Sequence, residues 1–555
     1  MLKIRLLINK LFTCVSGFSV VLMIAALIVI LGPIFAKGLS AVFFTGTVEF
    51  REMQFAKFDR GNRGQLATQK KSTDLARKPA YEIFDRFCKN NIDEDVITDT
   101  LKNKIHRPFC KKLSAEQNSD ATSKKRKRKI KKLKRYSGKI LKHISAALET
   151  DDQQEAIEEA LAAVTLAKKS GIADDKIGAQ YLPLTTRIAK IIKAHSPKNR
   201  KLMSNQIVEI RDSMKKILGP RPGQILPALE RDQFGATRWE YATRYRNDLL
   251  YYNIYVLQPD KTNKLVRKKR ADLFAGSEML KFFEHFENNL EKMMLPESTV
   301  YWNYFTDTHT SGYTFGGVGP EVVGTLTVTV LSMLFAFPLG LITAAFLAEV
   351  KPTGKHADLI GAVLKVIRTC INTLAGVPSI VFGLFGLAFF VLYLQPKMGM
   401  KSESSILAGA MTLAILILPV IIRASEEAIR AVPRYYREAS LALGASKLRT
   451  FLTVTFPASL PGILTGVILA MSRAAGETAP LIFTAVAATG AMTKGIDHPT
   501  QVLSYGSFEI VVGDITSMNL PHKQYGMVMS LILIVLILNL SAIIIRSRVS
   551  KKLRG

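Results

Sequence analysis

The sequence predicts an all-α, polytopic membrane protein with six transmembrane helices and a large, mostly helical insert outside the cytoplasm. The first observation is a contrast in composition, because 48% of the 555 residues are hydrophobic while the formal net charge is +31. This combination indicates apolar spans and charged segments that are kept apart along the chain. The second observation is the length of the apolar stretches, since a helix needs about 20 apolar residues to cross a bilayer. The apolar fraction also excludes a chain that is disordered throughout.

Apolar stretches of sufficient length occur six times. The expected spans are roughly Leu11–Ala36, Val322–Leu347, Leu374–Leu394, Ile406–Ile422, Leu460–Val486 and Met527–Ile545. The first stretch holds no charged residue and is longer than the core of a cleaved signal peptide, which is about 7–15 residues. It also lacks a clear small-residue cleavage site, so we expect an uncleaved membrane anchor.

The orientation follows from the basic residues in short loops, which favour the cytoplasm. The N-terminus, the loops after the second and fourth spans and the C-terminal tail are basic, and the loop after the second span carries Lys351, Lys355, Lys365 and Arg368. Both termini are therefore expected in the cytoplasm. The predicted divisions are 1–36 (N-terminus and first span), 37–319 (extracytoplasmic insert), 320–546 (five further spans) and 547–555 (basic tail).

The insert contains a run of basic residues from Lys124 to Arg135. Alone, such a run suggests nucleic-acid binding or nuclear import, but neither is expected outside the cytoplasm. A solvated linker is favoured, and attraction to anionic lipid, polymer or substrate is the alternative. Helical periodicity over 140–167 and 188–218 predicts a small helical domain around the run, with Gly219 and Pro220 ending the second helix. Cys88 and Cys110 could share an outer loop, and their pairing is left open.

Signatures of catalysis are absent from the sequence. We find no phosphate-cradling P-loop, no HExxH, no GxSxG and no paired-cysteine spacing typical of a metal site. We therefore predict no catalytic residue, no cofactor and no metal. If the protein moves a substrate against a gradient, the energy must come from a partner.

The loop after the fourth span predicts a rigid knob of two short helices on the cytoplasmic face. Pro433 suits the first turn of a helix, and Gly444 permits a sharp turn of the backbone. A second short helix follows from Ala445 to Val454, and Pro457 is expected to end it before the fifth span. Such a knob could transmit force from a bound partner to the neighbouring spans. The simpler alternative is an ordinary amphipathic connector helix.

The same loop resembles the EAA loop of ABC-importer permeases, which is the helix that docks into a cleft of the ATPase subunit. The matching residues are Glu438, Ala439, Ser440, Gly444 and the segment Val454–Pro457. The departures are Ser440 for the second alanine, Val454 for isoleucine and Phe456 for leucine, and none removes the glycine turn or the terminal proline. The resemblance implies that Glu438, Ala439, Ser440, Gly444 and Pro457 couple the chain to an ATPase.

Two further segments, 374–386 and 471–481, extend the resemblance to the PstA family of membrane subunits in phosphate importers. The likeness covers roughly residues 320–546 and leaves out the insert. It implies a permease in the bacterial inner membrane that pairs with a second, homologous permease subunit. It also implies two ATPase subunits on the cytoplasmic side and an extracytoplasmic phosphate-binding protein. Membrane lipid and phosphate would be the other partners, and nucleic acid would not be one.

The fifth predicted span carries the candidate substrate pathway. Arg473 lies about mid-span, where a charge is costly and usually marks a functional position. Glu477 is four residues further along, so the two side chains can pair on one helix face. A guanidinium fits the oxygens of phosphate, and Ser472 and Thr478 add hydroxyl groups nearby. The alternative is a purely structural ion pair.

Other residues and other functions remain possible at this point. For Pro378 and Ser379 in the third span, and for Gly376, Gly383 and Gly386 there, close helix packing and a kink are favoured over substrate binding. A permease for another oxyanion, such as sulfate or molybdate, is the first alternative function. A membrane-anchored sensor or scaffold, with the insert as its functional part, is the second.

Overall fold

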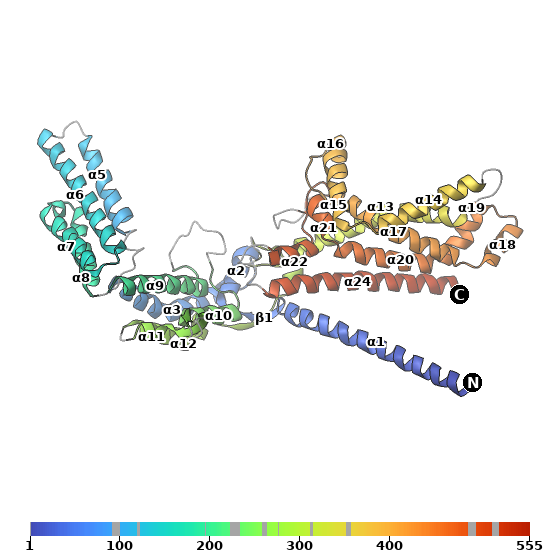
Figure 1. Cartoon of the computed structure of the whole chain (residues 1–555), viewed down its shortest axis with the longest axis horizontal. Helices are drawn as coiled ribbons and strands as arrows, with labels where there is room; N and C mark the ends of the chain where they lie inside the picture. Colours follow the sequence, from blue (N-terminus) through green and yellow to red (C-terminus); the bar gives the residue numbers. More distant parts are fainter. Residues whose placement is uncertain are drawn as a thin grey trace. The chain divides into compact units, whose positions relative to one another are not determined.

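The computed structural model describes residues 2–90, 100–118, 123–194, 196–222, 234–257, 263–275, 277–310, 313, 315–350, 357–486, 495–512 and 521–554. The chain forms two compact units (Figure 1). We call Met1–Phe44 together with Thr299–Gly555 the membrane unit, and Thr45–Ser298 the insert unit. The boundaries between the units fall inside β1 (Phe43–Gly46) and β4 (Glu297–Val300), which form a two-stranded sheet.

Six helices among the described residues of the membrane unit are long and apolar enough to cross a membrane, which confirms the predicted fold class. They span Leu11–Leu39, Gly319–Glu349, Ser379–Lys397, Ile406–Arg430, Lys447–Gly476 and His522–Lys552. The first two spans belong to α1 (Leu2–Leu39) and α13 (Gly319–Glu349), and the third consists of α15 (Ser379–Gly386), η7 (Leu387–Leu394) and α16 (Gln395–Lys397). The fourth is α17 (Ile406–Arg430), the fifth consists of α19 (Lys447–Thr450), η8 (Phe451–Thr455) and α20 (Phe456–Gly476), and the sixth belongs to α24 (Pro521–Arg554). Figure 1 shows the α-helices under these labels.

Helix α17 is the centre of the membrane unit, where it packs against α13, α15 and α20. Small residues bring the backbones close: a Cβ atom on Gly466 would lie 2.3 Å from Cβ of Ala424. Glycines of α15 have the packing role that the sequence favoured, since a Cβ on Gly383 would lie 2.8 Å from Cα of Pro480. Outward-facing side chains such as Leu334 are exposed and apolar, as the surface of a helix in contact with lipid must be.

The ends of two spans differ from the prediction, and prolines explain both differences. The fifth span does not continue to Val486, because α20 ends at Gly476 and a separate short helix, α21 (Ala479–Thr484), follows. Pro480 cannot donate a backbone hydrogen bond and clashes with the preceding turn, so the helix breaks before it. The third span starts at Ser379 rather than Leu374, because Pro378 disfavours helical backbone in the residue before it.

Helix α14 (Ala357–Ala375) was not predicted. Its residues were assigned to a basic cytoplasmic loop on the strength of Lys365 and Arg368, which lie within it. The helix is amphipathic: Leu364 and Ile371 are buried, Lys365 is exposed, and Arg368 pairs with Glu426 of α17 at 3.1 Å. Lys351 and Lys355, two of the loop residues used to predict orientation, lie outside the described residues.

The remaining helices of the membrane unit are short. Among the described residues they are η5 (Trp302–Phe305), α18 (Arg434–Ala442) and α22 (Leu503–Val512).

The described residues of the insert unit are mostly helical, as expected, and they also include a β-hairpin. One group of elements consists of α2 (Val48–Phe58), α3 (Arg63–Asn90), α9 (Pro197–Leu218), α10 (Trp239–Leu250), β2 (Tyr251–Leu257), β3 (Asn263–Lys269), α11 (Arg270–Leu273) and α12 (Met279–Met294). Its core contains buried phenylalanines, including Phe84 and Phe282, whose ring centroids are 5.8 Å apart. Strands β2 and β3 pair antiparallel, and this hairpin was not predicted.

A helical bundle forms the rest of the insert unit. Its elements are η1 (Thr100–His106), α5 (Arg107–Gln117), α6 (Lys124–Glu149), α7 (Gln153–Lys169), η2 (Ile172–Asp174), η3 (Gly178–Gln180) and α8 (Tyr181–Ala194). The periodic stretch 140–167 is divided between α6 and α7, because the Asp152 side chain accepts hydrogen bonds from backbone N–H groups and starts a new helix there. The stretch 188–218 is likewise divided by Pro197, and its predicted end at Gly219 is confirmed.

The basic run Lys124–Arg135 is the first half of α6, so the expectation of a solvated linker is wrong. Ile130 and Leu133, three residues apart, are buried in the bundle core and hold the run in a helix. Cys88 and Cys110 are both free thiols, and burial raises the pKa of the Cys88 thiol to about 11.

Candidate functional site

The loop after α17 forms a knob of two short helices, defined here as residues 433–455. Pro433 precedes α18, and Gly444 has a φ of 82°, which a side chain would strain. A Cβ atom at Gly444 would meet nothing within 4 Å, so backbone conformation, rather than packing, requires glycine there. No residue of α18 is buried, and Leu443 and Leu448 are highly exposed. The knob therefore presents an uncovered apolar surface.

The knob is tied firmly to the ends of the spanning helices. Arg437 lies 3.1 Å from the carboxylate of Glu349 at the end of α13 and donates to the carbonyl oxygen of Ile429 in α17 over 2.6 Å. Within the knob, the hydroxyl groups of Ser440 and Thr450 lie 3.0 Å apart and join α18 to α19. Arg437 thus connects α18 to α13 and α17 through charge-assisted hydrogen bonds. Sequence reasoning did not identify this role of Arg437, because its ion-pair partner Glu349 is distant in the chain.

Pro457 does not end the second helix of the knob, contrary to the prediction. The chain continues from α19 through the π-helical turn η8 into α20, and Pro457 lies at the start of α20. A π turn shifts the hydrogen-bonding pattern by one residue. This shift accommodates the missing N–H group of the proline. The knob is therefore continuous with the helix that carries Arg473.

Arg473 and Glu477 are brought together as the sequence predicted. Arg473 lies in the last turn of α20, and its Nε donates to Glu477 Oε1 over 3.3 Å. Glu477 is the residue that ends the helix, and its carbonyl oxygen accepts a hydrogen bond from Ser504 Oγ at 3.1 Å. The Arg473 side chain is 39% exposed and the Glu477 side chain 19%. The guanidinium thus retains an open side on an otherwise apolar helix.

Ser472 and Thr478 do not join this pair. Ser472 Oγ donates to Asn539 Oδ1 in α24 over 2.7 Å, so this hydroxyl connects two spanning helices. Asn539 lies within the apolar part of α24. Because the fifth span ends at Gly476, Arg473 lies in its last turn, and the expectation that Arg473 lies about mid-span is wrong. Thr478 precedes α21, and its side chain does not cap that helix.

A buried polar cluster near the start of α13 was missed by sequence reasoning. His309 Nε2 lies 3.0 Å from the Glu321 carboxylate and 2.7 Å from Gln501 Oε1, and the ring stacks on Tyr313 at 4.1 Å. Burial alone lowers the pKa of His309, but the hydrogen bonds and charge of its partners, with Glu321 first, outweigh it and raise the pKa above the ordinary value. Histidines scattered along a sequence give no signal for such a contact.

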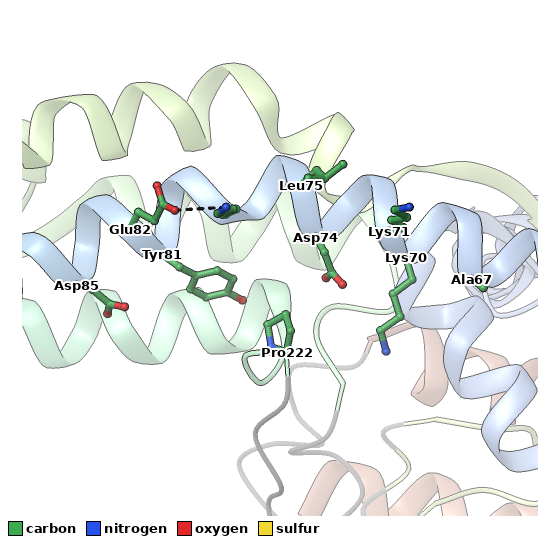
Figure 2. Close-up of a pocket in the computed structure, with 10 residues that line it drawn as sticks. Ala67, Lys70, Lys71, Asp74, Leu75, Tyr81, Glu82, Asp85 and Pro222 are labelled. Atoms are coloured by element: carbon green, nitrogen blue, oxygen red, sulfur yellow. Dashed lines mark ion pairs between the residues drawn. The ribbon is translucent and has the colours of Figure 1, made fainter.

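The insert unit contains a groove of about 620 Å³ along α3, beside Pro222 (Figure 2). Cations and carboxylates line it in equal measure, and Lys78 pairs with Glu82 at 3.8 Å. The balance of charge gives this groove no preference for an anion. In the parts of the chain that the structure describes, no three histidine, cysteine or acidic side chains lie close enough to hold a metal ion.

Comparisons with known proteins match the part of the chain that holds the knob and Arg473. The family model "Binding-protein-dependent transport system inner membrane component" matches residues 336–555. The probable ABC transporter permease protein YqgI of Bacillus subtilis is 41% identical over 170 residues, which are 31% of this chain and 53% of YqgI. The phosphate transport system permease protein PstA 1 of Mycobacterium tuberculosis H37Rv is 33% identical over 248 residues, which are 43% of this chain and 72% of that protein.

The extent of these matches differs between the relatives. The chain spans only 53% of YqgI and 63% of the related Bacillus subtilis permease YqgH. A solved structure of the MetNI methionine ABC transporter aligns with 41% of this chain and 94% of its own, at 21% identity and a TM-score of 0.33. Because the alignment with PstA 1 spans most of that relative, the chain belongs to the PstA-type permeases among the binding-protein-dependent transport system inner membrane components.

Proposed function

We propose that the chain is the transmembrane permease subunit of an ATP-driven phosphate importer. The observation that carries this proposal is the Arg473–Glu477 pair, a part-exposed guanidinium in the last turn of an otherwise apolar spanning helix. A charge in that position is costly unless it serves a passing ligand or a partner. The name of PstA 1, a phosphate transport system permease protein, supports phosphate as the substrate.

In the proposed mechanism, Arg473 shares its donors between Glu477 and a passing phosphate. The planar guanidinium offers a fork of N–H groups that matches two oxygens of the anion. Glu477 competes for the same donors and lies at 3.3 Å, so the anion is held only moderately and can be released. The exposed side of Arg473 would face a second, homologous permease subunit, with the pathway between the two.

The knob is proposed to dock into a separate ATPase, because the sequence contains no phosphate-cradling P-loop that would bind a nucleotide. The exposed Leu443 and Leu448 supply the apolar contact, and Gly444 sets the angle between the two short helices. Movement of α18 would act on α13 and α17 through Arg437. ATP binding would turn the pathway outward and hydrolysis would reset it.

The proposed assembly contains two ATPase subunits and an extracytoplasmic binding protein that delivers phosphate. The chain would lie in the bacterial inner membrane with both termini in the cytoplasm. Residues 37–319 would then face the periplasm, and the five spans within 320–546 would form the permease core.

The test is uptake of labelled phosphate in cells that lack this chain and receive it back as the natural sequence or as Arg473→Ala. Hydrogen bonds to charged groups contribute about 1.5–3 kcal/mol, so we expect uptake to fall by about 10- to 100-fold. Arg546→Ala is the matched control, because Arg546 is a part-exposed arginine of the same unit that contacts Thr465 in α20. If uptake of sulfate or molybdate, rather than phosphate, depends on Arg473, the substrate assignment is wrong.

A second experiment tests the coupling. Leu443→Asp places a charge on the most exposed apolar residue of the knob, and we expect it to prevent co-purification of the ATPase and to abolish uptake. Lys447→Asp is the control for added negative charge beside the same turn. If Leu443→Asp retains both the ATPase and uptake, the knob is an ordinary connector, and a sensor or scaffold function is favoured.

A further inference from the structure

Five basic residues of α6 line a groove of about 460 Å³ that the transport function does not use. They are Lys124, Lys125, Arg128, Lys129 and Lys132. The groove lies on the exposed face of α6, opposite the side where Ile130 and Leu133 are buried in the bundle. The fold of the insert unit therefore presents these five cations together and holds the helix behind them.

Helix geometry places the basic side chains of this face close enough to repel one another. Lys124, Arg128 and Lys132 are four residues apart and form one row, and Lys125 and Lys129 form a second. Like charges at this spacing destabilise a helix, and the sequence contains no acidic residue between Lys124 and Leu148 to relieve the repulsion. Side chains that destabilise the helix to which they belong are typical of a functional site.

Neighbouring elements neutralise little of this charge. Lys129 lies 3.8 Å from Asp174, and Arg126, outside the groove, pairs with Glu116 at 2.7 Å. Within the described residues, no carboxylate lies within 4 Å of the charged groups of Lys124, Lys125, Arg128 or Lys132. The groove along α3 in Figure 2 differs, since its lysines face an equal number of carboxylates.

We propose that the α6 groove binds a linear inorganic phosphate polymer. Such a chain carries charge at every unit and matches both the lysine ammonium groups and the fork of Arg128. Along the helix, successive cations of one row are about 6 Å apart, since four residues rise by 1.5 Å each. An extended anionic chain that follows the helix therefore meets a cation from one row or the other at short intervals.

The composition of the groove disfavours other polyanions. Single-stranded nucleic acid is held by stacking of bases on aromatic side chains, and no aromatic residue is among those that line the groove. Binding to a membrane surface combines basic residues with exposed apolar ones, whereas Ile130 and Leu133 are buried. A phosphate chain needs neither bases nor an apolar anchor.

The experiment measures binding of fluorescently labelled polyphosphate to the full chain in nanodiscs of zwitterionic lipid. The groove variant combines Lys125→Gln, Arg128→Gln and Lys132→Gln. Each basic residue near a polyanion adds a factor of about five in affinity, so we expect a loss on the order of 100-fold at low salt. The slope of log affinity against log salt concentration should fall by about 2.

The matched control removes three exposed lysines of the same bundle, with Lys168→Gln, Lys169→Gln and Lys193→Gln. It carries the same change in net charge and should lose less than about threefold in affinity. An equal loss in the two variants would show an effect of net charge only and would overturn the proposal. Binding of poly-glutamate, single-stranded DNA or anionic vesicles that equals polyphosphate binding would also overturn it. This assay needs no transport, so its result is independent of the proposed import function.

Discussion

The two units each contain an arginine–glutamate pair, and the pairs differ mainly in burial. In the insert unit, Arg77 and Glu49 lie 2.9 Å apart with side chains that are 7% and 5% exposed. In the membrane unit, Arg473 and Glu477 lie 3.3 Å apart with exposures of 39% and 19%. The first guanidinium is surrounded by protein, whereas the second keeps an open side. The same kind of ion pair therefore stabilises the insert unit, whereas in the membrane unit the guanidinium of Arg473 is accessible to a ligand.

Further hydrogen bonds show that the buried Arg77–Glu49 pair has a structural role. Arg77 Nε donates to the carbonyl oxygen of Met293 in α12 over 2.9 Å, and Nη1 donates to that of Leu218 in α9 over 3.1 Å. Glu49 also accepts from the backbone N–H of Gly235 at 3.0 Å. One side chain thereby connects α2, α3, α9 and α12. No comparable set of protein acceptors is described around Arg473.

The largest expected effect is that of Arg77→Met. Removal of one partner from a buried ion pair leaves an uncompensated charge and costs about 3–5 kcal/mol. Hydrogen exchange of the α3 and α12 amides in the full chain should accelerate by about two to four orders of magnitude. Lys78→Ala, in the exposed pair with Glu82, should change exchange less than about fivefold. If these amides still exchange slowly in Arg77→Met, the Arg77–Glu49 pair does not have the structural role that the comparison gives it.

Arg473→Ala should separate function from stability. Because the side chain is part-exposed and its pair has a separation of 3.3 Å, we expect Arg473→Ala to destabilise α20 much less than Arg77→Met destabilises α3. Uptake should nevertheless fall as described for the transport test. Hydrogen exchange of α20 measures the first quantity in the same preparation. If α20 exchanges as fast as α3 does in Arg77→Met, the pair is structural, and the comparison fails.

Ser472→Ala tests whether the residue next to Arg473 belongs to the packing or to the pathway. Its hydroxyl donates to Asn539 Oδ1, and hydrogen bonds between membrane helices contribute about 0.6 kcal/mol on average. We expect a small loss of stability between α20 and α24 and uptake within about twofold of normal. Asn539→Ala should have the same effect, and the double variant should add little more. A tenfold loss of uptake in Ser472→Ala alone would return the residue to the substrate pathway.

Local sequence patterns predicted the features that depend on few neighbours. The lengths of the apolar stretches predicted all six spans. The spacing of four residues predicted the pairing of Arg473 with Glu477, and Gly444 predicted the turn of the knob. Predictions from hydrophobic periodicity and from charge were wrong where one residue within the pattern decided the local structure. Asp152 and Pro197 divide helices that periodicity had joined, and Ile130 was overlooked within a basic run.

Contacts between segments that are distant in the chain could not be predicted from the sequence. The partner of Ser472 is 67 residues away, and that of Arg77 in the buried pair belongs to another helix. The fold, rather than the spacing along the chain, decides which side of each guanidinium is covered. Burial is therefore the quantity that the sequence could not supply, and it is also the quantity that distinguishes the two arginine–glutamate pairs.

The His309–Glu321 pair shows whether burial or location decides the role, because it is buried like Arg77–Glu49 but belongs to the membrane unit. The pKa of His309 is raised above its unfolded value of about 6.5. Its contribution to stability is therefore fully present below about pH 6.5 and is lost as the pH rises through the higher, folded pKa. The effect should be the smallest of the four, since burial opposes the influence of Glu321 on that pKa. Gln501 and Tyr313 also contact the ring, and Tyr313 leads to Glu509 through a 3.0 Å hydrogen bond.

Thermal unfolding of the membrane unit, followed as a function of pH in the full chain, measures this contribution. His309→Gln should remove the decline in stability above pH 6.5, while His498→Gln, at an exposed histidine beside Asp497, should leave it unchanged. Uptake by His309→Gln at low pH should remain within about threefold of normal, as expected for a pair that holds structure. If uptake falls without any change in unfolding, the buried pair acts in transport, and burial does not separate structural from functional charges in this protein.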